Sequence, residues 1–363
     1  MRIAIFTELY APSVGGQEVF FAGLGRALLR RGHQLEVYCI AHQEGLPASE
    51  MLDGITVHRT LMAPNYTRPR FAAMRRDWMA LSRFALHTRR IALRREHDFY
   101  LLNQWPFMHV VTLPRYARRR ALLHWCEVRE SRFFRIMQGY LPRRARLNAA
   151  ISDRVGQQIQ SMSGCEAMTL PSGLDLDKSV SMPRCERRDI LAVGRITKHK
   201  NLGILVEAFE ILCQHGYTGR LKIVGDGPEM DVLRARVASS PQQGRIDLLG
   251  FIDETEKFSL MSRCEVLALP SKREGFPHAV AEAMSCGLPI ATVDYPENGT
   301  KAVVEVYRSG VVTDQSADDL AAGIERLCDG WDLYSANGQM AARSLDWNII
   351  AETLEAKLIH VSG

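Results

Sequence analysis

Short apolar runs recur along this chain, and each is followed by a turn and a segment with helical periodicity. In the first half these runs cover residues 2–6, 34–40, 99–102, 121–125, 149–152 and 168–171. In the second half they cover residues 189–193, 221–224, 246–249, 266–269, 289–293 and 310–312. Such runs are typical of strands buried on both faces in parallel sheets covered by helices. The alternation predicts an α/β fold with two doubly wound, Rossmann-like halves that face a central cleft.

The chain length agrees with two domains, because 363 residues exceed the roughly 150 residues of an average domain. A polar stretch, residues 172–188, lies between the two series of strands and is typical of a linker. We therefore expect a first domain over residues 1–180 and a second over residues 181–345.

Composition excludes several classes of protein. The residues are 46% hydrophobic and 24% charged, as in soluble globular proteins, and no apolar run approaches the ~18 residues of a membrane span. Because the sequence opens with a strand, we expect no signal peptide and a cytoplasmic location. The 8 cysteines are scattered without a C-x-x-C pair or a histidine cluster at metal spacing, so neither a disulfide nor a metal site is expected.

Positive charge is concentrated in the first half. Residues 1–180 hold 26 basic against 15 acidic residues, whereas residues 181–363 hold 20 against 26. Residues 51–150 alone contain 20 arginines and 6 acidic residues. The Arg-rich region 70–146 is therefore a candidate to contact an anionic membrane surface or an anionic substrate, with a merely solvated face as the alternative. It contains no base-stacking module, so nucleic acid is not expected as a partner.

One segment of this region has a helical period. At about 100° per residue its apolar face consists of Met74, Trp78, Leu81, Ala85, Thr88 and Ala92. The opposite face carries Arg76, Arg83, Arg90 and Arg94. The pattern predicts an amphipathic, strongly basic helix over residues 70–95.

Two carboxylates bracket a strand-to-helix junction in the second half. Glu274 follows the apolar run 266–269, and Glu282 lies one turn into a helix expected from about His278. In open α/β sheets ligands bind at the carboxyl ends of the strands. Glu274 and Glu282 are therefore candidate ligand-binding residues, and on their chemistry alone they could form an acid/base pair.

A cationic loop follows another strand of the second half. Residues 194–201 lead into a helix that we expect from about Leu202, so Arg195 and Lys200 flank a helix N-terminus. The amides and dipole of such an N-terminus favour anions, and a guanidinium and an ammonium add to this preference. We favour a diphosphate site over a solvated surface loop, because the strand end with Glu274 lies in the same sheet.

A glycine-containing loop follows the first strand and leads into a helix from about Glu18 to Arg31. Gly15 and Gly16 would let a backbone amide approach an anion closely, and a tight turn without a ligand is the alternative. The dinucleotide fingerprint G-x-G-x-x-G is absent, which argues against a dinucleotide-binding domain.

Two further polar features are less specific. His124 lies near the end of the strand 121–125, and a lone histidine is more often structural than catalytic. The pair Asp175-x-Asp177 has the pattern of a metal clamp used in sugar transfer, but its place at a domain junction argues against that role.

Together these motifs resemble those of the family 4 retaining glycosyltransferases, which have the two-domain GT-B fold. The resemblance runs nearly end to end. The matching segments are Pro12-Ser-Val-Gly-Gly16, Arg31-Gly-His33, Leu123-His124, Leu170-Pro-Ser-Gly-Leu-Asp175, Val193-Gly-Arg-Ile-Thr-Lys-His-Lys200, Val224-Gly-Asp-Gly-Pro-Glu229 and the E-x7-E element Glu274 to Glu282. The C-terminal helix, residues 346–363, matches the tail that crosses back to complete the first domain.

The resemblance implies a role for each candidate residue. Arg195 and Lys200 would hold the donor diphosphate, and Glu282 would hold the ribose hydroxyls. The transferred sugar would be held by Glu274 with the backbone amides after it, and the donor site would include Gly275, Phe276 and Pro277. The donor site would also include Gly15, Gly16 and Ile252, with Gly16 contacting the diphosphate from the first domain. His124 would lie beside the donor sugar near the acceptor, so the implied catalytic residues are Glu274, His124, Arg195 and Lys200.

The resemblance also implies an activity. A hexosyl-type sugar would move, with retention of configuration and without a metal or other cofactor, from a UDP- or GDP-linked donor to an acceptor hydroxyl. The implied setting is cell-surface polysaccharide, lipopolysaccharide or glycolipid assembly. We expect an anionic or lipid-linked glycan acceptor and docking on the inner face of the cytoplasmic membrane.

Two other functions stay open, and so does the role of Glu274. The chain could be a GT-B nucleotide-sugar epimerase or hydrolase, or a non-catalytic basic binding subunit. Glu274 could be a nucleophile or only a sugar ligand.

Overall fold

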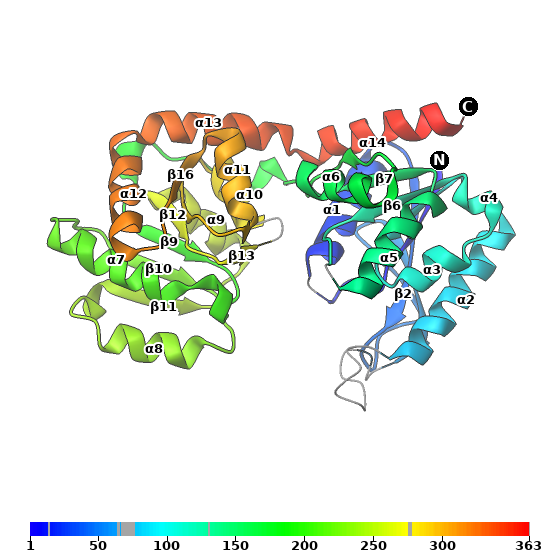
Figure 1. The fold of residues 1–363 in the computed structure, drawn as a ribbon, viewed down its shortest axis with the longest axis horizontal. Coiled ribbons are helices and arrows are strands. Elements are labelled where there is room, and N and C mark those ends of the chain that lie inside the picture. Colours follow the sequence, from blue (N-terminus) through cyan, green and yellow to red (C-terminus); the bar gives the residue numbers. More distant parts are fainter. Residues whose placement is uncertain (14, 64–65, 67–76, 130, 275–277, 363) are drawn as a thin grey trace. The chain divides into compact units, whose positions relative to one another are not determined.

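The structure, a computed structural model, describes residues 1–13, 15–63, 66, 77–129, 131–274 and 278–362. The chain divides into two compact units (Figure 1), the first being Met1–Gly173 with Trp347–Gly363 and the second Leu174–Asp346. Each unit has its own sheet of mainly parallel strands flanked by helices. The expected α/β class with two doubly wound halves is confirmed.

The first unit is built on a sheet with the strand order β3-β4-β2-β1-β5-β6-β7-β8. Its strands are β1 (Arg2–Phe6), β2 (Gln34–Ala41), β3 (Ser49–Leu52), β4 (Ile55–Met62), β5 (Phe99–Asn103), β6 (Ala121–Trp125), β7 (Leu147–Ala150) and β8 (Met168–Thr169). Among the described residues every pair in this sheet is parallel except β3 with β4. The order reverses between β1 and β5, and doubly wound sheets bind ligands at the carboxyl ends of the strands at such a reversal.

The apolar pattern of the sequence does not reveal the β3–β4 hairpin at the edge of this sheet. Positions along β4 alternate between buried and partly exposed, but Arg59 occupies a buried one and so hides the apolar alternation. Its guanidinium donates to the backbone oxygen of Ala11 at 2.6 Å and forms an ion pair with Glu50. The turn Asp53-Gly54, with both residues at positive φ, is the signal that could have revealed the hairpin.

The helices of the first unit are α1 (Gly16–Arg30), α2 (Trp78–Arg94), α3 (Phe107–Thr112), α4 (Arg115–Arg118), α5 (Arg132–Tyr140), α6 (Asp153–Ser163) and α14 (Trp347–Ser362), with the 3-10 turn η1 (Leu141–Arg144). The basic helix expected over residues 70–95 corresponds to α2, and residues 70–76 lie outside the described residues. Asp77 caps α2 by accepting from the backbone N–H of Met79 at 2.9 Å. Trp78, expected on the apolar face, is 44% exposed because it packs edge-on against Phe107 instead of entering the core.

The second unit contains a parallel sheet with the order β11-β10-β9-β12-β14-β16. Its strands are β9 (Ile190–Val193), β10 (Leu221–Val224), β11 (Ile246–Gly250), β12 (Val266–Leu269), β14 (Ile290–Val293) and β16 (Gly310–Thr313), and β13 (Arg273–Glu274) pairs separately with β15 (Glu297–Asn298). Its helices are α7 (Leu202–Gln214), α8 (Met230–Ala238), α9 (Glu254–Arg263), α10 (His278–Ser285), α11 (Gly299–Tyr307), α12 (Ala317–Asp329) and α13 (Trp331–Ser344). Short 3-10 turns are η2 (Leu176–Lys178), η3 (Arg184–Glu186), η4 (Lys198–Lys200) and η5 (Gln243–Arg245).

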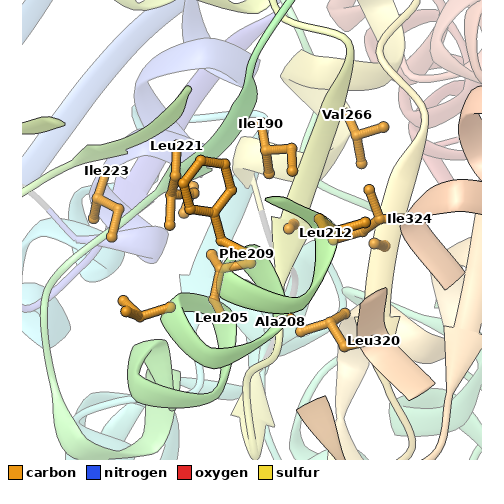
Figure 2. Close-up of a cluster of buried hydrophobic side chains, with 14 of the residues drawn as sticks. Ile190, Leu205, Ala208, Phe209, Leu212, Leu221, Ile223, Val266, Leu320 and Ile324 are labelled. Carbon is orange, nitrogen blue, oxygen red and sulfur yellow. The ribbon is translucent and has the colours of Figure 1, made fainter. Parts of the chain in front are cut away.

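One face of this sheet is covered by α7 and α12 (Figure 2). Phe209 and Leu212 of α7 are at most 1% exposed and pack against strand residues such as Ile190 and Leu221. The i, i+3, i+4 spacing of Leu205, Ala208 and Phe209 places them on one face of the helix. Burying this face fixes α7, and with it the loop that enters the helix from β9.

The boundary between the units differs from the expected position after residue 180. Residues from Leu174 onward belong to the second unit, because Leu174 donates its N–H to the oxygen of Leu345 at 2.8 Å and bridges to Asp346. Leu176 also packs against the core that contains β12 and α10.

The C-terminal helix α14 belongs to the first unit, as the family resemblance implied. Among the described residues, no helix combines the length and the apolarity needed to cross a bilayer.

Candidate active site

The strand order of the second unit reverses between β9 and β12, and expected donor residues follow both strands. Arg195 and Lys200 lie between β9 and α7, and Glu274 lies in β13 after β12. The side chain of Arg195 is exposed, whereas that of Lys200 is 15% exposed. Gly194 is required where it stands, because φ is +146° and a Cβ would lie 3.1 Å from Lys200 Nζ. This carboxyl edge of the sheet therefore carries one exposed guanidinium and one largely buried ammonium.

Lys200 and Glu274 form an ion pair across this strand reversal. The Lys200 ammonium donates to Glu274 Oε1, and the two side chains are 15% and 13% exposed. Ser271, which is fully buried, donates its hydroxyl to the same oxygen at 2.9 Å. Two donors thus fix the Glu274 carboxylate as a hydrogen-bond acceptor in one orientation.

Glu282 is held by a residue that no sequence motif contains. Lys257 Nζ of α9 donates to Glu282 Oε1 of α10 at 2.7 Å. Burial raises the pKa of Glu282, and the Lys257 ammonium opposes that effect. Burial, assisted by Lys257, also lowers the pKa of His278 to about 4, so this imidazole is neutral. No local spacing marks Lys257 in the sequence, because the pair joins residues on two helices.

The first unit offers a helix N-terminus at its own strand reversal. Gly15 precedes α1 at the N-cap position with no capping side-chain hydrogen bond, and Gly16 is exposed with no heavy atom within 4 Å of an ideal Cβ. The first amides of a helix without a side-chain cap are donors suited to an anion.

His124 in β6 is fully buried, and both ring nitrogens have partners. Nε2 lies 3.2 Å from the backbone oxygen of Leu170, and Nδ1 lies 3.4 Å from the amide nitrogen of Gln17. The ring stacks on Phe20 with centroids 3.9 Å apart. Burial lowers the pKa of His124 to about 4, so the imidazole is neutral at physiological pH. His124 exposes none of its surface and packs against the N-terminal part of α1. Its catalytic role stays a prediction.

The remaining expected site residues are less informative. Ile252 is partly buried and packs against the core that contains β12 and α10. Gly275, Phe276 and Pro277 lie outside the described residues. Asp175 lies 3.8 Å from Lys178 in an ion pair, and within the described part of the chain no group of three or more His, Cys, Asp or Glu could hold a metal.

A surface hollow of about 560 Å³ lies at the opposite, amino edge of the second sheet. Its lining includes Arg184, Arg188, Asp189, Tyr217 and Glu265. The two carboxylates there are already neutralised, since Glu265 pairs with Arg184 and Asp189 with Lys222. Because both carboxylates of this hollow already form ion pairs within the unit, we take the carboxyl edge of the sheet as the candidate site.

Two family models match the chain. Residues 14–178 match the model of glycosyltransferase family 4, and residues 177–343 match the model of glycosyl transferases group 1. An amylovoran biosynthesis glycosyltransferase of Erwinia amylovora is 32% identical over 148 residues, which cover 39% of this chain and 36% of that protein. The chain spans less than half the length of the first curated relatives that it matches.

Solved structures resemble the chain over nearly its whole length. Sucrose-phosphate synthase from Thermosynechococcus elongatus has a TM-score of 0.80 at 19% identity, covering 99% of this chain and 98% of that chain. Anabaena HepE in complex with UDP-glucose has a TM-score of 0.74 at 18% identity, covering 99% and 100%. These likenesses confirm the expected GT-B fold. Because the two family models together account for residues 14–343, the chain belongs to glycosyltransferase family 4.

Proposed function

We propose that this chain is a retaining, metal-independent glycosyltransferase that moves a hexosyl-type sugar from a nucleoside-diphosphate sugar to an acceptor hydroxyl. The observation that carries the proposal is the ion pair of Lys200 with Glu274 at the strand reversal between β9 and β12, in the loop that also contains the exposed Arg195. Family membership and the UDP-glucose bound in the similar HepE structure support a nucleotide-sugar donor. The proposed setting is assembly of a surface polysaccharide, lipopolysaccharide or glycolipid, and the likeness to an amylovoran biosynthesis glycosyltransferase and to WaaG, a glycosyltransferase involved in lipopolysaccharide biosynthesis, supports it.

The proposed chemistry depends on neutralising the leaving diphosphate. Arg195 and Lys200 supply two positive charges, which makes a metal ion unnecessary, and the amide end of α1 is the diphosphate-binding candidate of the first unit. When the phosphate binds Lys200, the ammonium gives up its bond to Glu274, and the carboxylate becomes available to sugar hydroxyls. We assign Glu274 the role of a sugar ligand, oriented by the Ser271 hydroxyl, which donates to Oε1. The leaving phosphate would then take the proton of the acceptor hydroxyl.

Donor binding and turnover test this proposal together. In a thermal-shift screen of UDP, GDP and their hexose conjugates, one nucleotide should raise the melting temperature, by the equivalent of about 2.7 kcal/mol at a hundredfold excess over Kd. Arg195→Ala and Lys200→Ala should each lower turnover about a hundredfold while the fold survives. Arg188→Ala is the matched control, because Arg188 is an exposed arginine at the amino end of β9.

Other outcomes would change the assignment. Near-normal turnover in Arg195→Ala or Lys200→Ala would contradict the diphosphate site. Steady product formation from the donor alone would favour the epimerase or hydrolase, and the absence of binding by every nucleotide would favour a non-catalytic basic subunit.

We further propose that the acceptor is lipid-linked or anionic and that the first unit docks on the inner face of the cytoplasmic membrane. The structure shows an exposed apolar surface within the Arg-rich region. We call Trp78, Phe107, Phe133, Ile136 and Tyr140 the aromatic ridge. Phe133, Ile136 and Tyr140 share one face of α5 and are 51%, 65% and 44% exposed.

Ring contacts connect the two ends of the aromatic ridge. Phe107 lies 5.7 Å from Phe133 and 6.1 Å from Trp78, measured between ring centroids. The neighbouring Arg132 and Arg135 are exposed. Aromatic and aliphatic side chains flanked by arginines suit the boundary between anionic headgroups and acyl chains. This charge complementarity favours an anionic membrane as the partner.

Liposome co-sedimentation tests the docking. The wild-type chain should bind anionic vesicles at low salt, and a Phe133→Ser, Ile136→Ser double variant should bind at least about tenfold more weakly, since two apolar side chains no longer enter the bilayer. Val232→Ser with Leu333→Ser is the matched control, because these residues are 63% and 64% exposed in the second unit. Failure of the wild-type chain to bind at low salt would count against docking.

A further inference from the structure

Glu282 belongs to a set of charges contributed by three elements of the second unit. Lys257 of α9 lies 2.7 Å from Glu282 of α10, and the two side chains are 20% and 15% exposed. Lys178 of η2 pairs with Glu254 of α9 at 2.7 Å. Because Glu254 precedes Lys257 by less than one helical turn, the two ion pairs lie on neighbouring positions of α9.

We propose that Lys257 is a positioning residue for the donor nucleoside, which holds the Glu282 carboxylate ionised and in one orientation so that it accepts the ribose hydroxyls. This inference rests on the proposed function, in which Glu282 is the ribose ligand. It concerns a residue of α9 that lies outside the matched E-x7-E element.

The geometry leaves part of the carboxylate for a ligand. Lys257 donates to Oε1, and within the described residues no other hydrogen bond reaches the Glu282 carboxylate. An ionised carboxylate only accepts hydrogen bonds, whereas a protonated one donates from one of its oxygens. A ribose with two adjacent hydroxyls as donors therefore binds better to the ionised form.

The charges around Glu282 show why a lysine is needed there. Burial raises the pKa of Glu282, and the nearby Glu254 raises it further. Lys257 and, more weakly, Lys178 lower it. His278, on the same helix, is neutral at physiological pH because its pKa is lowered to about 4. Lys257 is thus the main charge that favours the ionised form of this buried carboxylate.

A purely structural ion pair between α9 and α10 is the alternative. It would stabilise the unit, and its loss would lower the melting temperature without changing how nucleotide binding depends on pH. The pH dependence of binding separates the two explanations, because the inference requires that Lys257 acts through the protonation of Glu282.

The experiment is calorimetric titration of the full chain with UDP and with GDP between pH 4.5 and 8. Binding by the wild-type chain should weaken on acidification as Glu282 takes up a proton. In Lys257→Met the midpoint of this loss should move upward by about one pH unit, since an opposite charge at this distance is removed. Lys257→Arg should keep the wild-type midpoint. Titration of the diphosphate itself is common to all variants and cancels in the comparison.

Lys222→Met is the matched control. Lys222 pairs with Asp189 at 2.8 Å, and these side chains are 23% and 16% exposed, but the pair lies at the amino edge of the same sheet. This variant should keep the wild-type midpoint. In a Glu282→Gln background, Lys257→Met should cause no further shift.

Several outcomes would overturn the inference. If the midpoint of the acid-induced loss of binding is unchanged in Lys257→Met, the ion pair is purely structural. If Lys222→Met causes the same shift as Lys257→Met, the shift is not specific to Lys257 and the inference also fails. If Lys257→Met does not fold, Lys257→Gln takes its place, because glutamine keeps a hydrogen-bond donor but carries no charge. A raised midpoint would again support the inference, and an unchanged midpoint would overturn it. Absence of UDP and GDP binding by the wild-type chain at every pH would overturn the proposed function and this inference with it, whereas normal binding with an unshifted midpoint overturns the inference alone.

Discussion

The two carboxylates of the candidate site are each held by a lysine that is distant in sequence. Lys200 could be expected near Glu274, because both follow strands of one sheet and both belong to motifs of the family. Lys257 could not be expected near Glu282, because no motif contains it and the pair depends on how α9 packs beside α10. Motif spacing therefore predicted the candidate ligand-binding groups, while packing decided which lysine pairs with each.

Buried histidines give the first unit a pH dependence at the residue scale. Burial lowers the pKa of the fully buried His109 in α3 to about 4. An unfolded histidine titrates near pH 6.5, so between these values the unfolded state binds more protons and stability falls as the pH falls. Between pH 6.5 and pH 5 the free energy of unfolding should fall by about 1–2 kcal/mol less in His109→Leu than in the wild-type chain, measured by urea denaturation at each pH.

Val110→Ala is the control for this prediction. Val110 is fully buried in the same helix but carries no ionisable group, so its replacement should lower stability without changing its dependence on pH. Parallel stability curves for the wild type and His109→Leu would contradict the prediction.

At the scale of elements, α1 connects the candidate anion-binding loop to the C-terminal helix. Gln17 and Phe20 of α1 contact His124, and Phe20 also meets the Trp347 ring with centroids 5.8 Å apart. An ideal Cβ on Gly23 would lie 2.2 Å from the Trp347 indole, so only glycine fits there. The sequence predicted both helices, but this contact required the structure, because the residues come from opposite ends of the chain.

Trp347 should therefore contribute strongly to the docking of α14. Trp347 is 3% exposed, and Trp347→Ala should destabilise the first unit by about 3–5 kcal/mol through the loss of buried surface and the cavity left behind. The measurement is chemical denaturation followed by circular dichroism. Trp78→Ala, which removes a 44% exposed indole, should cost much less. Equal effects of the two substitutions would show that α14 is not anchored through Trp347.

At the scale of the whole molecule, the chain separates into two units that differ in charge. The first half has an excess of basic residues and the second an excess of acidic ones. The exposed aromatic ridge belongs to the first unit, and the paired charges around Glu274 and Glu282 belong to the second. This division agrees with the proposal that one unit meets a membrane or an anionic acceptor while the other binds the donor.

The sequence by itself determined most of the succession of strands and helices and the loops at their carboxyl ends. These features depend on short-range periodicity and on residue type, which are readable along the chain. Only the tertiary structure decided the burial of Arg59 beside Ala11, the exposure of Trp78, the burial of His124 and the pairing of Lys257 with Glu282. Each of these depends on contacts between segments far apart in sequence, because burial and charge pairing are set by the neighbours that folding brings together.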